Sequence, residues 1–197
     1  LTANRPLSDA PGLVAALVVQ VMLLAGLRRV GDGTRATAAW HWAVFAAGFI
    51  IGVRSQTLWL TVPFVLWGLL RLVRQRRTGD AVIAIGAGAG GALLWFVPMV
   101  VLTGGIGRYI QALGSQGAED FAGVEMLARS FTARQLNVAL SQTFVAPWQW
   151  RTLAHVMLGL ALIGAWRLTR RQRPALGIVL LGFVPYCLFH LAFHETA

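Results

Sequence analysis

Long apolar stretches alternate with short polar segments along almost the whole chain. A membrane-spanning helix needs about 20 mostly apolar residues to cross a hydrocarbon core of about 30 Å. Two of the six apolar stretches, the third (Leu58–Leu70) and the fifth (Leu153–Trp166), are short. We expect the third to gain length by snorkelling of Arg71 or by local thinning of the bilayer. The pattern predicts an all-α fold, a polytopic transmembrane helix bundle that forms a single domain over residues 1–197. The six predicted spans are Pro11–Leu27, Ala36–Val53, Leu58–Leu70, Ala81–Leu102, Leu153–Trp166 and Pro174–Phe193.

The polar segment Thr103–Arg151 separates the fourth span from the fifth and is expected to form one long outer loop. Its glycines at positions 104, 105 and 107 are expected to end the fourth span. From Arg108 onward we expect a helix that lies along the membrane surface. Residues Gly114–Gly123 then predict a flexible acidic stretch.

A second surface helix is predicted near the end of this loop. Thr132 and Gln135 have the spacing of a capping box, in which side chains at the start of a helix satisfy its first backbone N–H groups. The helix is expected to run to about Val145, and residues 147–150 then form an aromatic anchor in the membrane interface. These features are typical of a protein whose substrate lies in the membrane plane, and equally of a structural outer loop.

The composition indicates that lipid, and not water, surrounds these helices. Hydrophobic residues make up 57% of the chain and charged residues 12%, whereas soluble domains carry about 25% charged residues. This excludes a disordered chain, a disulfide scaffold and an ordinary cytosolic enzyme, and the single cysteine, Cys187, lies within an apolar stretch. The net charge of +10 does not indicate nucleic acid, because the basic residues form short clusters between apolar stretches.

All 17 basic residues are arginine, and most of them follow the first, third and fifth spans. Alternating spans place these three loops on one side of the membrane. Because an excess of arginine in short loops marks the cytoplasmic side, we expect both ends of this sequence to lie outside. The arginines that follow these spans are Arg28, Arg29, Arg35, Arg71, Arg74, Arg76, Arg77, Arg167, Arg170, Arg171 and Arg173.

Two motifs that suggest binding sites have simpler explanations. Residues Ala81–Gly91 match the glycine spacing of a dinucleotide-binding loop, but the βαβ unit and the acid that such a site needs are missing, so no nucleotide cofactor is expected. Gly86 and Gly90 instead have the spacing that lets two transmembrane helices approach closely. His190 and His194 share a helix face and could bind a divalent metal, although a helix end in the membrane interface is the default explanation for such a pair.

Charged side chains are nearly absent from the predicted spans, where His41 and His155 lie near span ends. Ion-coupled transporters usually place acids or bases near the middle of the membrane, so we expect the chemistry at the outer surface. There the turn between the second and third spans is so short that Arg54 must lie at the membrane face. A guanidinium at that depth binds either a lipid head group or a substrate phosphate. Before the first span, Ser8 or Asp9 is expected to cap the helix.

Several polar segments on the expected outer side occur in the order seen in a known family. They are Arg5–Gly12, Arg54–Leu60, Leu113–Gln116, Glu119–Gly123, Pro185–His190 and Glu195-Thr196. In these segments the chain resembles the bacterial membrane glycosyltransferases of the GT-C fold, in the group of protein mannosyltransferase-like and aminoarabinose transferase-like enzymes.

This resemblance implies transfer of a sugar from a polyprenyl-phosphate carrier to a lipid, glycan or protein acceptor, on the outer face of the bacterial inner membrane. Basic residues or a divalent metal are then expected to neutralise the lipid phosphate. Arg54, with its neighbour Gln56, is the first candidate for this role, and Arg5 and Arg108 follow. The outer carboxylates expected to hold acceptor hydroxyls or a metal are Asp9, Glu119, Asp120 and Glu195.

The family's principal catalytic carboxylate lies in the first outer loop. The sequence begins at Leu1 without a signal peptide and stops just after its last span, so we expect that loop, with further spans, upstream of Leu1. The alternative is a multi-span transporter or lipid-flipping protein without glycosyl transfer, and a purely structural membrane subunit is a third possibility. Acids within the spans would favour transport, whereas arginines and carboxylates at the outer face favour transfer from a lipid carrier.

Overall fold

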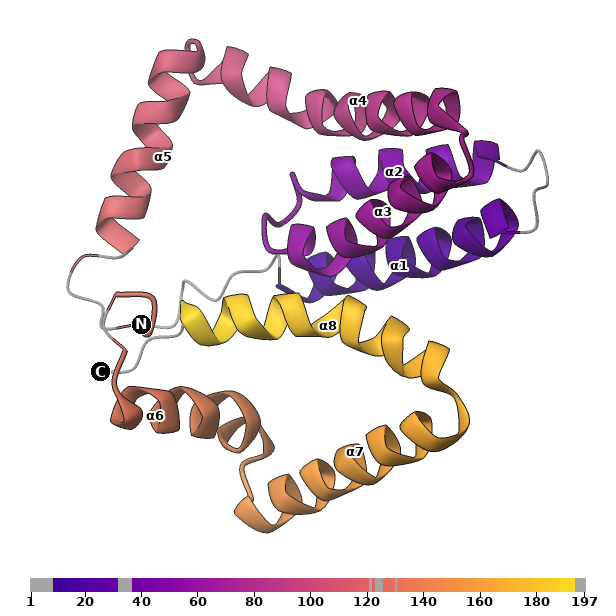
Figure 1. Cartoon of the computed structure of the whole chain (residues 1–197). Coiled ribbons are helices and arrows are strands. Elements are labelled where there is room, and N and C mark those ends of the chain that lie inside the picture. Colours follow the sequence, from indigo (N-terminus) through magenta and orange to yellow (C-terminus); the bar gives the residue numbers. More distant parts are fainter. Residues whose placement is uncertain (1–8, 32–36, 121, 123–125, 130, 194–197) are drawn as a thin grey trace. The chain divides into compact units, whose positions relative to one another are not determined.

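The computed structural model describes residues 9–31, 37–120, 122, 126–129 and 131–193 (Figure 1). These residues form eight α-helices and one short 3-10 helix, which confirms the predicted all-helical fold class for the described part of the chain. The helices are α1 (Asp9–Gly31), α2 (Thr37–Ile50), α3 (Thr57–Arg74), α4 (Thr78–Leu102), α5 (Ile106–Asp120), α6 (Ala133–Phe144), η1 (Ala146–Trp148), α7 (Arg151–Arg171) and α8 (Arg173–Ala192).

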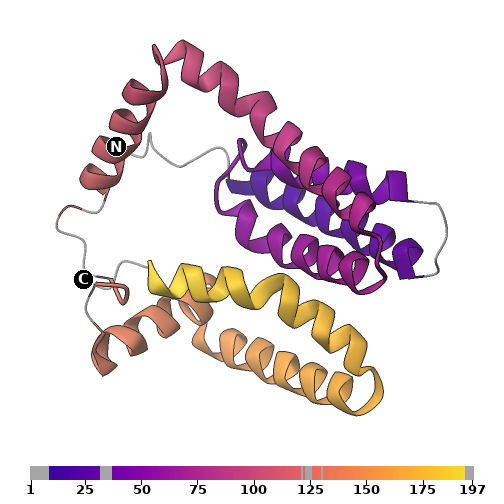
Figure 2. The same ribbon diagram turned by 45° about the horizontal axis from the view of Figure 1, so that its top comes forward.

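The chain divides into two compact units, Leu1–Leu113 and Gly114–Ala197. In the first unit, α2 packs against α1, α3 and α4 (Figure 2). Its Trp40 is fully buried, in a slot that glycines on both neighbouring helices leave open. A Cβ at Gly68 of α3 would collide with the indole, and a Cβ at Gly26 of α1 would lie 3.1 Å from the Trp40 backbone. The missing side chains therefore let a large aromatic residue form the centre of this unit.

Glycines also bring α2 and α4 together. A Cβ at Gly48 would collide with the Gly88 carbonyl, and a Cβ at Gly91 would collide with the Phe45 carbonyl. Gly86 has no other atom within 4 Å of the position of a Cβ. A Cβ at Gly90 would lie 3.9 Å from the Phe45 ring, so the pair with the helix-packing spacing does not form the close part of the α2–α4 contact. Positions 84, 88 and 91 share the α4 face that meets α2, whereas position 86 is about 200° away from 88 around the helix.

Among the described residues, five helices are long and apolar enough to cross a membrane, as expected for a multi-pass membrane protein; they are α1, α3, α4, α7 and α8. Both helices that were expected to be short are longer than predicted, because α3 continues through its arginines to Arg74 and α7 runs from Arg151 to Arg171. Arg71 lies within the longer helix, and its predicted snorkelling stays a prediction. Its Nη1 atom donates to the Leu27 carbonyl at 3.3 Å, at the end of α1.

The second predicted span is instead the short one. α2 has 14 residues and ends at Ile50, three residues before the predicted end at Val53. At a rise of 1.5 Å per residue its length is about 21 Å, less than the hydrocarbon thickness of about 30 Å. The helix stops because the chain turns at Gly52, where the indole of Trp95 occupies the space that a side chain would need.

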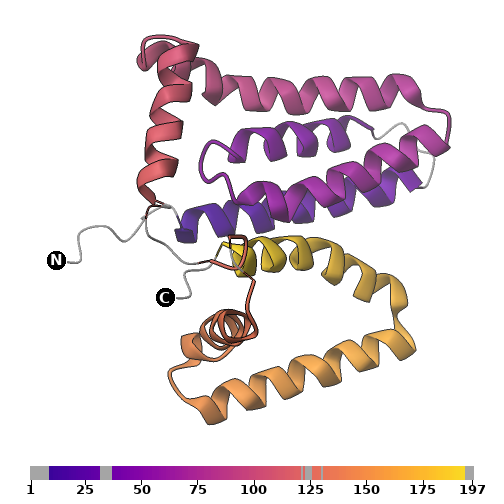
Figure 3. The same cartoon turned by 60° about the vertical axis from the view of Figure 1, so that its left-hand side comes forward.

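Two glycines end α4, as the sequence predicts. Gly104 and Gly105 have φ values of 85° and 110°, in the left-handed region that favours glycine. The chain then turns sharply into α5 (Figures 1 and 3), and the rings of Phe96 and Tyr109 meet edge to face at 5.4 Å across this turn. A helix that begins close to Arg108 is thereby confirmed, and its place along the membrane surface stays a prediction.

The prediction of a flexible stretch over Gly114–Gly123 was wrong for residues 114–120, which are helical. Each glycine costs a helix interior only about 1 kcal/mol relative to alanine, and the residues between these glycines are compatible with a helix. Asp120 is the last residue of α5, and positions 121 and 123 lie outside the described residues.

In the second unit, α7 and α8 form an antiparallel hairpin (Figure 2), and α8 also packs against α6. The predicted N-terminus of α6 is confirmed, since the Thr132 hydroxyl accepts a hydrogen bond from the Gln135 backbone N–H at 3.2 Å. A backbone bond from the Ala128 N–H to the Ala192 carbonyl, 2.9 Å long, joins the segment before α6 to the end of α8. Many of the large apolar side chains of α7 and α8 are exposed, a pattern compatible with helices that face lipid.

Candidate functional site

Arg54 lies in a rigid turn between α2 and α3. Its backbone N–H donates to the Ile50 carbonyl at 3.2 Å, and its carbonyl accepts from the Thr57 N–H at 3.0 Å. The Thr57 hydroxyl, which is 2% exposed, also donates to the Arg54 carbonyl at 2.7 Å. Because a buried hydroxyl and two backbone bonds fix the turn, the Cα of Arg54 has a well-defined position at this end of the unit.

The side chain of Arg54 is oriented by two further contacts. Its Nε atom donates to the Oε1 atom of Gln56 at 2.6 Å, so these two predicted site residues lie together. Its aliphatic part crosses α1 at Gly12, where a Cβ would lie 3.0 Å from the Arg54 Cβ and 3.1 Å from its Cδ. The guanidinium is therefore directed by Gln56 and by the missing side chain at Gly12.

α4 supports the same turn from its other side. The indole of Trp95 packs against Gly52, and its Nε1 atom donates to the Gly48 carbonyl at 3.2 Å. The start of α1, the α2–α3 turn and the second half of α4 thus meet at one end of the first unit. The opposite end carries Arg71 at the end of α3, beside the end of α1.

This arrangement suits an anion. A guanidinium keeps its positive charge at every relevant pH and pairs with phosphate through two parallel hydrogen bonds. The start of α1 adds the partial positive charge of a helix N-terminus. Asp9 is the first residue of α1, three residues before Gly12 and thus on the same helix face; its side chain is outside what the structure describes.

The other predicted residues are more widely distributed. Arg108 lies in the first turn of α5 and is exposed, and its side chain folds back over Gly104. Glu119 and Asp120 are in the last turn of α5, with side chains that the structure does not describe. Arg5, Ser8, His194 and Glu195, which were also predicted to have roles, lie outside the described residues.

The histidines that the structure describes have structural partners. His41 Nε2 lies 3.2 Å from the Asp80 carbonyl, and His155 Nδ1 lies 2.6 Å from the Arg151 carbonyl, one turn earlier in α7. His190 stacks on Tyr186 with ring centroids 6.2 Å apart. Among the described residues, no three His, Cys, Asp or Glu side chains come close enough together to hold a metal ion. Within the described part of the chain there is therefore no set of ligands for the divalent metal that His190 and His194 suggested.

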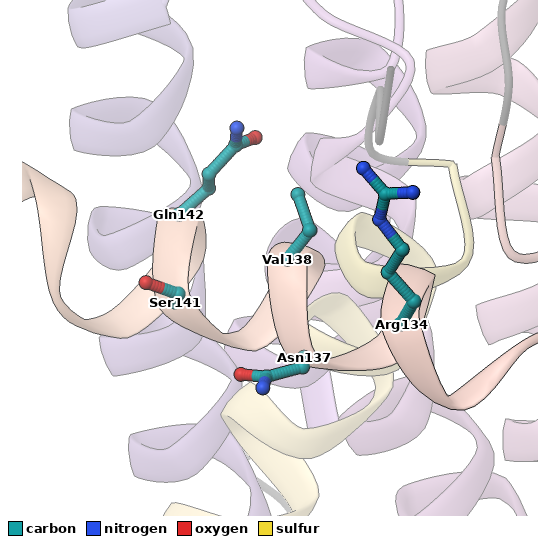
Figure 4. Close-up of a pocket in the computed structure, with 5 residues that line it drawn as sticks. All are labelled: Arg134, Asn137, Val138, Ser141 and Gln142. Atoms are coloured by element: carbon teal, nitrogen blue, oxygen red, sulfur yellow. The ribbon is translucent and has the colours of Figure 1, made fainter.

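A second polar surface lies along α6, beside an open hollow of about 390 Å³. Figure 4 shows Arg134, Val138 and Gln142 pointing to one side of this helix, with Asn137 and Ser141 on the adjoining side. These groups can hydrogen-bond to a hydroxylated ligand, but none of them is an acid or a base of the kind that catalyses group transfer at neutral pH. We therefore regard the α2–α3 turn as the principal candidate site.

The residues that position Arg54 were missed by the sequence analysis. Gly12 and Trp95 are far from Arg54 in sequence, and Thr57 was seen only as part of the turn. The only available signals were a glycine one turn into a helix and a tryptophan between apolar neighbours, and both occur commonly without such a role.

Comparison of the chain with protein-family models, with curated proteins and with solved structures finds no match.

Proposed function

We propose that this protein is a membrane glycosyltransferase, which moves a sugar from a polyprenyl-phosphate carrier to an acceptor at the outer face of the bacterial inner membrane. The observation that carries the proposal is the orientation of Arg54 by Gln56 and Gly12 at one end of a membrane-compatible helical unit. The resemblance of the outer segments to GT-C glycosyltransferases supports the same function.

The chemistry explains why an oriented arginine matters here. When the bond from the sugar to the phosphate breaks, the lipid phosphate leaves with additional negative charge. A guanidinium that is already in place stabilises this charge without reorganisation, an effect of the type that is often the largest in catalysis. In this proposal Arg54 holds the leaving phosphate, Gln56 fixes the guanidinium, and carboxylates of the outer segments orient the acceptor hydroxyl.

The test is turnover of polyprenyl-phosphate sugars by membranes that contain the protein expressed from its complete coding sequence. We expect the wild type to release polyprenyl phosphate from at least one member of a panel of hexose and pentose donors. Arg54→Ala should lower this rate by about 10²- to 10³-fold, the usual cost of one lost donor to a developing anion. Arg54→Lys should recover part of the rate, because an ammonium keeps the charge but not the paired geometry.

Arg74→Ala is the matched control. Arg74 is an exposed arginine in the last turn of α3, whereas Arg54 lies in the turn just before the first residue of that helix. It should leave the rate unchanged. Unchanged turnover by Arg54→Ala at normal expression would remove Arg54 from the site. Failure of the wild type to release polyprenyl phosphate from any donor, together with movement of a labelled polyprenyl phosphate across vesicle membranes, would favour the lipid-flipping alternative.

A further inference from the structure

A groove lies at the turn between α7 and α8, in the second unit, and contains none of the residues of the proposed function. It has a volume of about 470 Å³ and is lined by Thr169, Arg170, Arg173, Leu176, Gly177 and Leu180. The two arginines come from the last turn of α7 and the first residue of α8, and the remaining α8 residues are apolar. The groove therefore combines two positive charges with a hydrophobic floor.

Both arginines are held in place by α7. Arg173 Nε donates to the Thr169 carbonyl at 3.3 Å, and the guanidinium carbon of Arg170 lies 5.6 Å from the centre of the Trp166 ring. Neither α7 nor α8 contains an aspartate or a glutamate. The two positive charges thus have no carboxylate on their own helices, and an anion from outside the chain would complement them.

The floor of the groove is open because position 177 has no side chain. A Cβ at Gly177 would meet no other atom within 4 Å, and Leu180, one turn further on, is 48% exposed. Leu176 and Leu180 share a face of α8, so they form an apolar strip that runs from the arginines along the helix. A strip of this kind can accommodate an acyl chain beneath a charged head group.

We propose that this groove binds an anionic phospholipid, with Arg170 and Arg173 on its phosphate and an acyl chain along Leu176, Gly177 and Leu180. Basic pockets between transmembrane helices at the cytoplasmic side are suited to such head groups, and arginine content predicts that side for this turn. Trp166, one turn before Arg170, is of a residue type that is favoured at the membrane interface. The proposal does not depend on glycosyl transfer.

The experiment measures retained lipid by native mass spectrometry on the full chain, purified from vesicles of phosphatidylcholine and phosphatidylglycerol in equal amounts. We expect the wild type to retain phosphatidylglycerol about tenfold or more in preference to phosphatidylcholine, since each arginine near the surface adds a substantial attraction. The double variant Arg170→Gln/Arg173→Gln should lose this preference. Gly177→Leu should lower phosphatidylglycerol retention with both arginines present, because the new side chain fills the floor.

Two matched controls keep the result interpretable. Gly164→Leu adds the same side chain to α7 at a position that is equally open, and Arg151→Gln removes an arginine from the other end of α7. Both should retain phosphatidylglycerol like the wild type. If the double glutamine variant does not fold, Arg170→Lys/Arg173→Lys should fold and keep most of the preference.

Three results would overturn the proposal. The first is equal retention of the two lipids by the wild type. The second is unchanged phosphatidylglycerol retention by Gly177→Leu, which would leave the groove without an acyl chain. The third is displacement of the lipid by millimolar inorganic phosphate, which would show that the arginines recognise phosphate alone.

Discussion

Gly12 is the residue on which the geometry of the candidate site depends most directly. The aliphatic part of Arg54 lies against it, and any side chain at this position would compete for the same space. We expect Gly12→Leu to displace the Arg54 guanidinium from Gln56 and to lower transfer from the lipid-phosphate donor by about tenfold or more, because misplacement of a positioning contact by about 1 Å has such effects.

The control for this change is Gly86→Leu, which adds the same side chain to α4 where a Cβ meets no other atom within 4 Å. Its turnover should equal that of the wild type. The two variants are compared by donor turnover and by thermal unfolding in detergent. Equal turnover in both would show that Gly12 does not position Arg54.

Arg54 and Gln56 were predictable from the sequence, because a turn of so few residues between two apolar stretches leaves them no other place. Their orientation was not predictable, because it depends on a contact with a glycine in another helix. A sequence pattern indicates on which face of its helix a residue lies and at what depth in the membrane. Which neighbouring helix contacts that face is determined only when the helices pack. The place of Asp9 at the start of α1 was predictable in the same way, from the rules of helix capping.

At the scale of elements, the α2–α4 contact shows that the spacing of small residues does not by itself identify the helix face that meets a neighbour. Several pairs of small residues at a spacing of four occur in the glycine-rich part of α4, and the closest approach to α2 is at Gly88 and Gly91. We expect Gly48→Leu to destabilise the protein by roughly 1–3 kcal/mol or more, the cost of overpacking a close contact. Gly86→Leu, on the open face, should unfold at the same temperature as the wild type.

The measurement is the thermal midpoint of each purified variant, followed by circular dichroism at a helix band. A midpoint of Gly48→Leu equal to that of Gly86→Leu would mean that α2 and α4 do not pack through these glycines in the membrane protein.

The N-terminal cap of α6 also concerns a single element, because both capping residues belong to the start of this helix. The Thr132 hydroxyl accepts from the Gln135 N–H and donates to the Gln135 side-chain oxygen at 2.9 Å, so the predicted capping residues are both engaged. Thr132→Ala should destabilise the first turn of α6 by about 1 kcal/mol, whereas Thr132→Ser should retain the cap. Hydrogen exchange at the Gln135 and Leu136 amides reports this directly; equally slow exchange in the alanine variant would contradict the cap.

At the scale of the whole molecule, the alternation of arginine-rich and arginine-poor turns predicts which segments share a side of the membrane. Within the first unit, the Arg71 bond to the Leu27 carbonyl joins the ends of α1 and α3, and the Gly12–Arg54 contact joins the start of α1 to the α2–α3 turn. The chain therefore returns from one end of this unit to the other through α2, although α2 is shorter than a full span.

This connection leads to a prediction about topology that can be tested residue by residue. In a Cys187→Ala background, single cysteines at Ser55, Arg28, Gln75 and Gln172 would be exposed to a thiol reagent that does not cross membranes. We expect Ser55→Cys to react in intact cells, and the other three to react only after the membrane is permeabilised, since arginine-rich turns lie in the cytoplasm. Equal reaction of Arg28→Cys and Ser55→Cys in intact cells would mean that α2 does not carry the chain across. If Gln172→Cys reacts in intact cells and Gln75→Cys does not, the chain crosses the membrane an odd number of times between these two positions. That result would contradict the expectation that α4 and α7 are the two spans on either side of a surface segment.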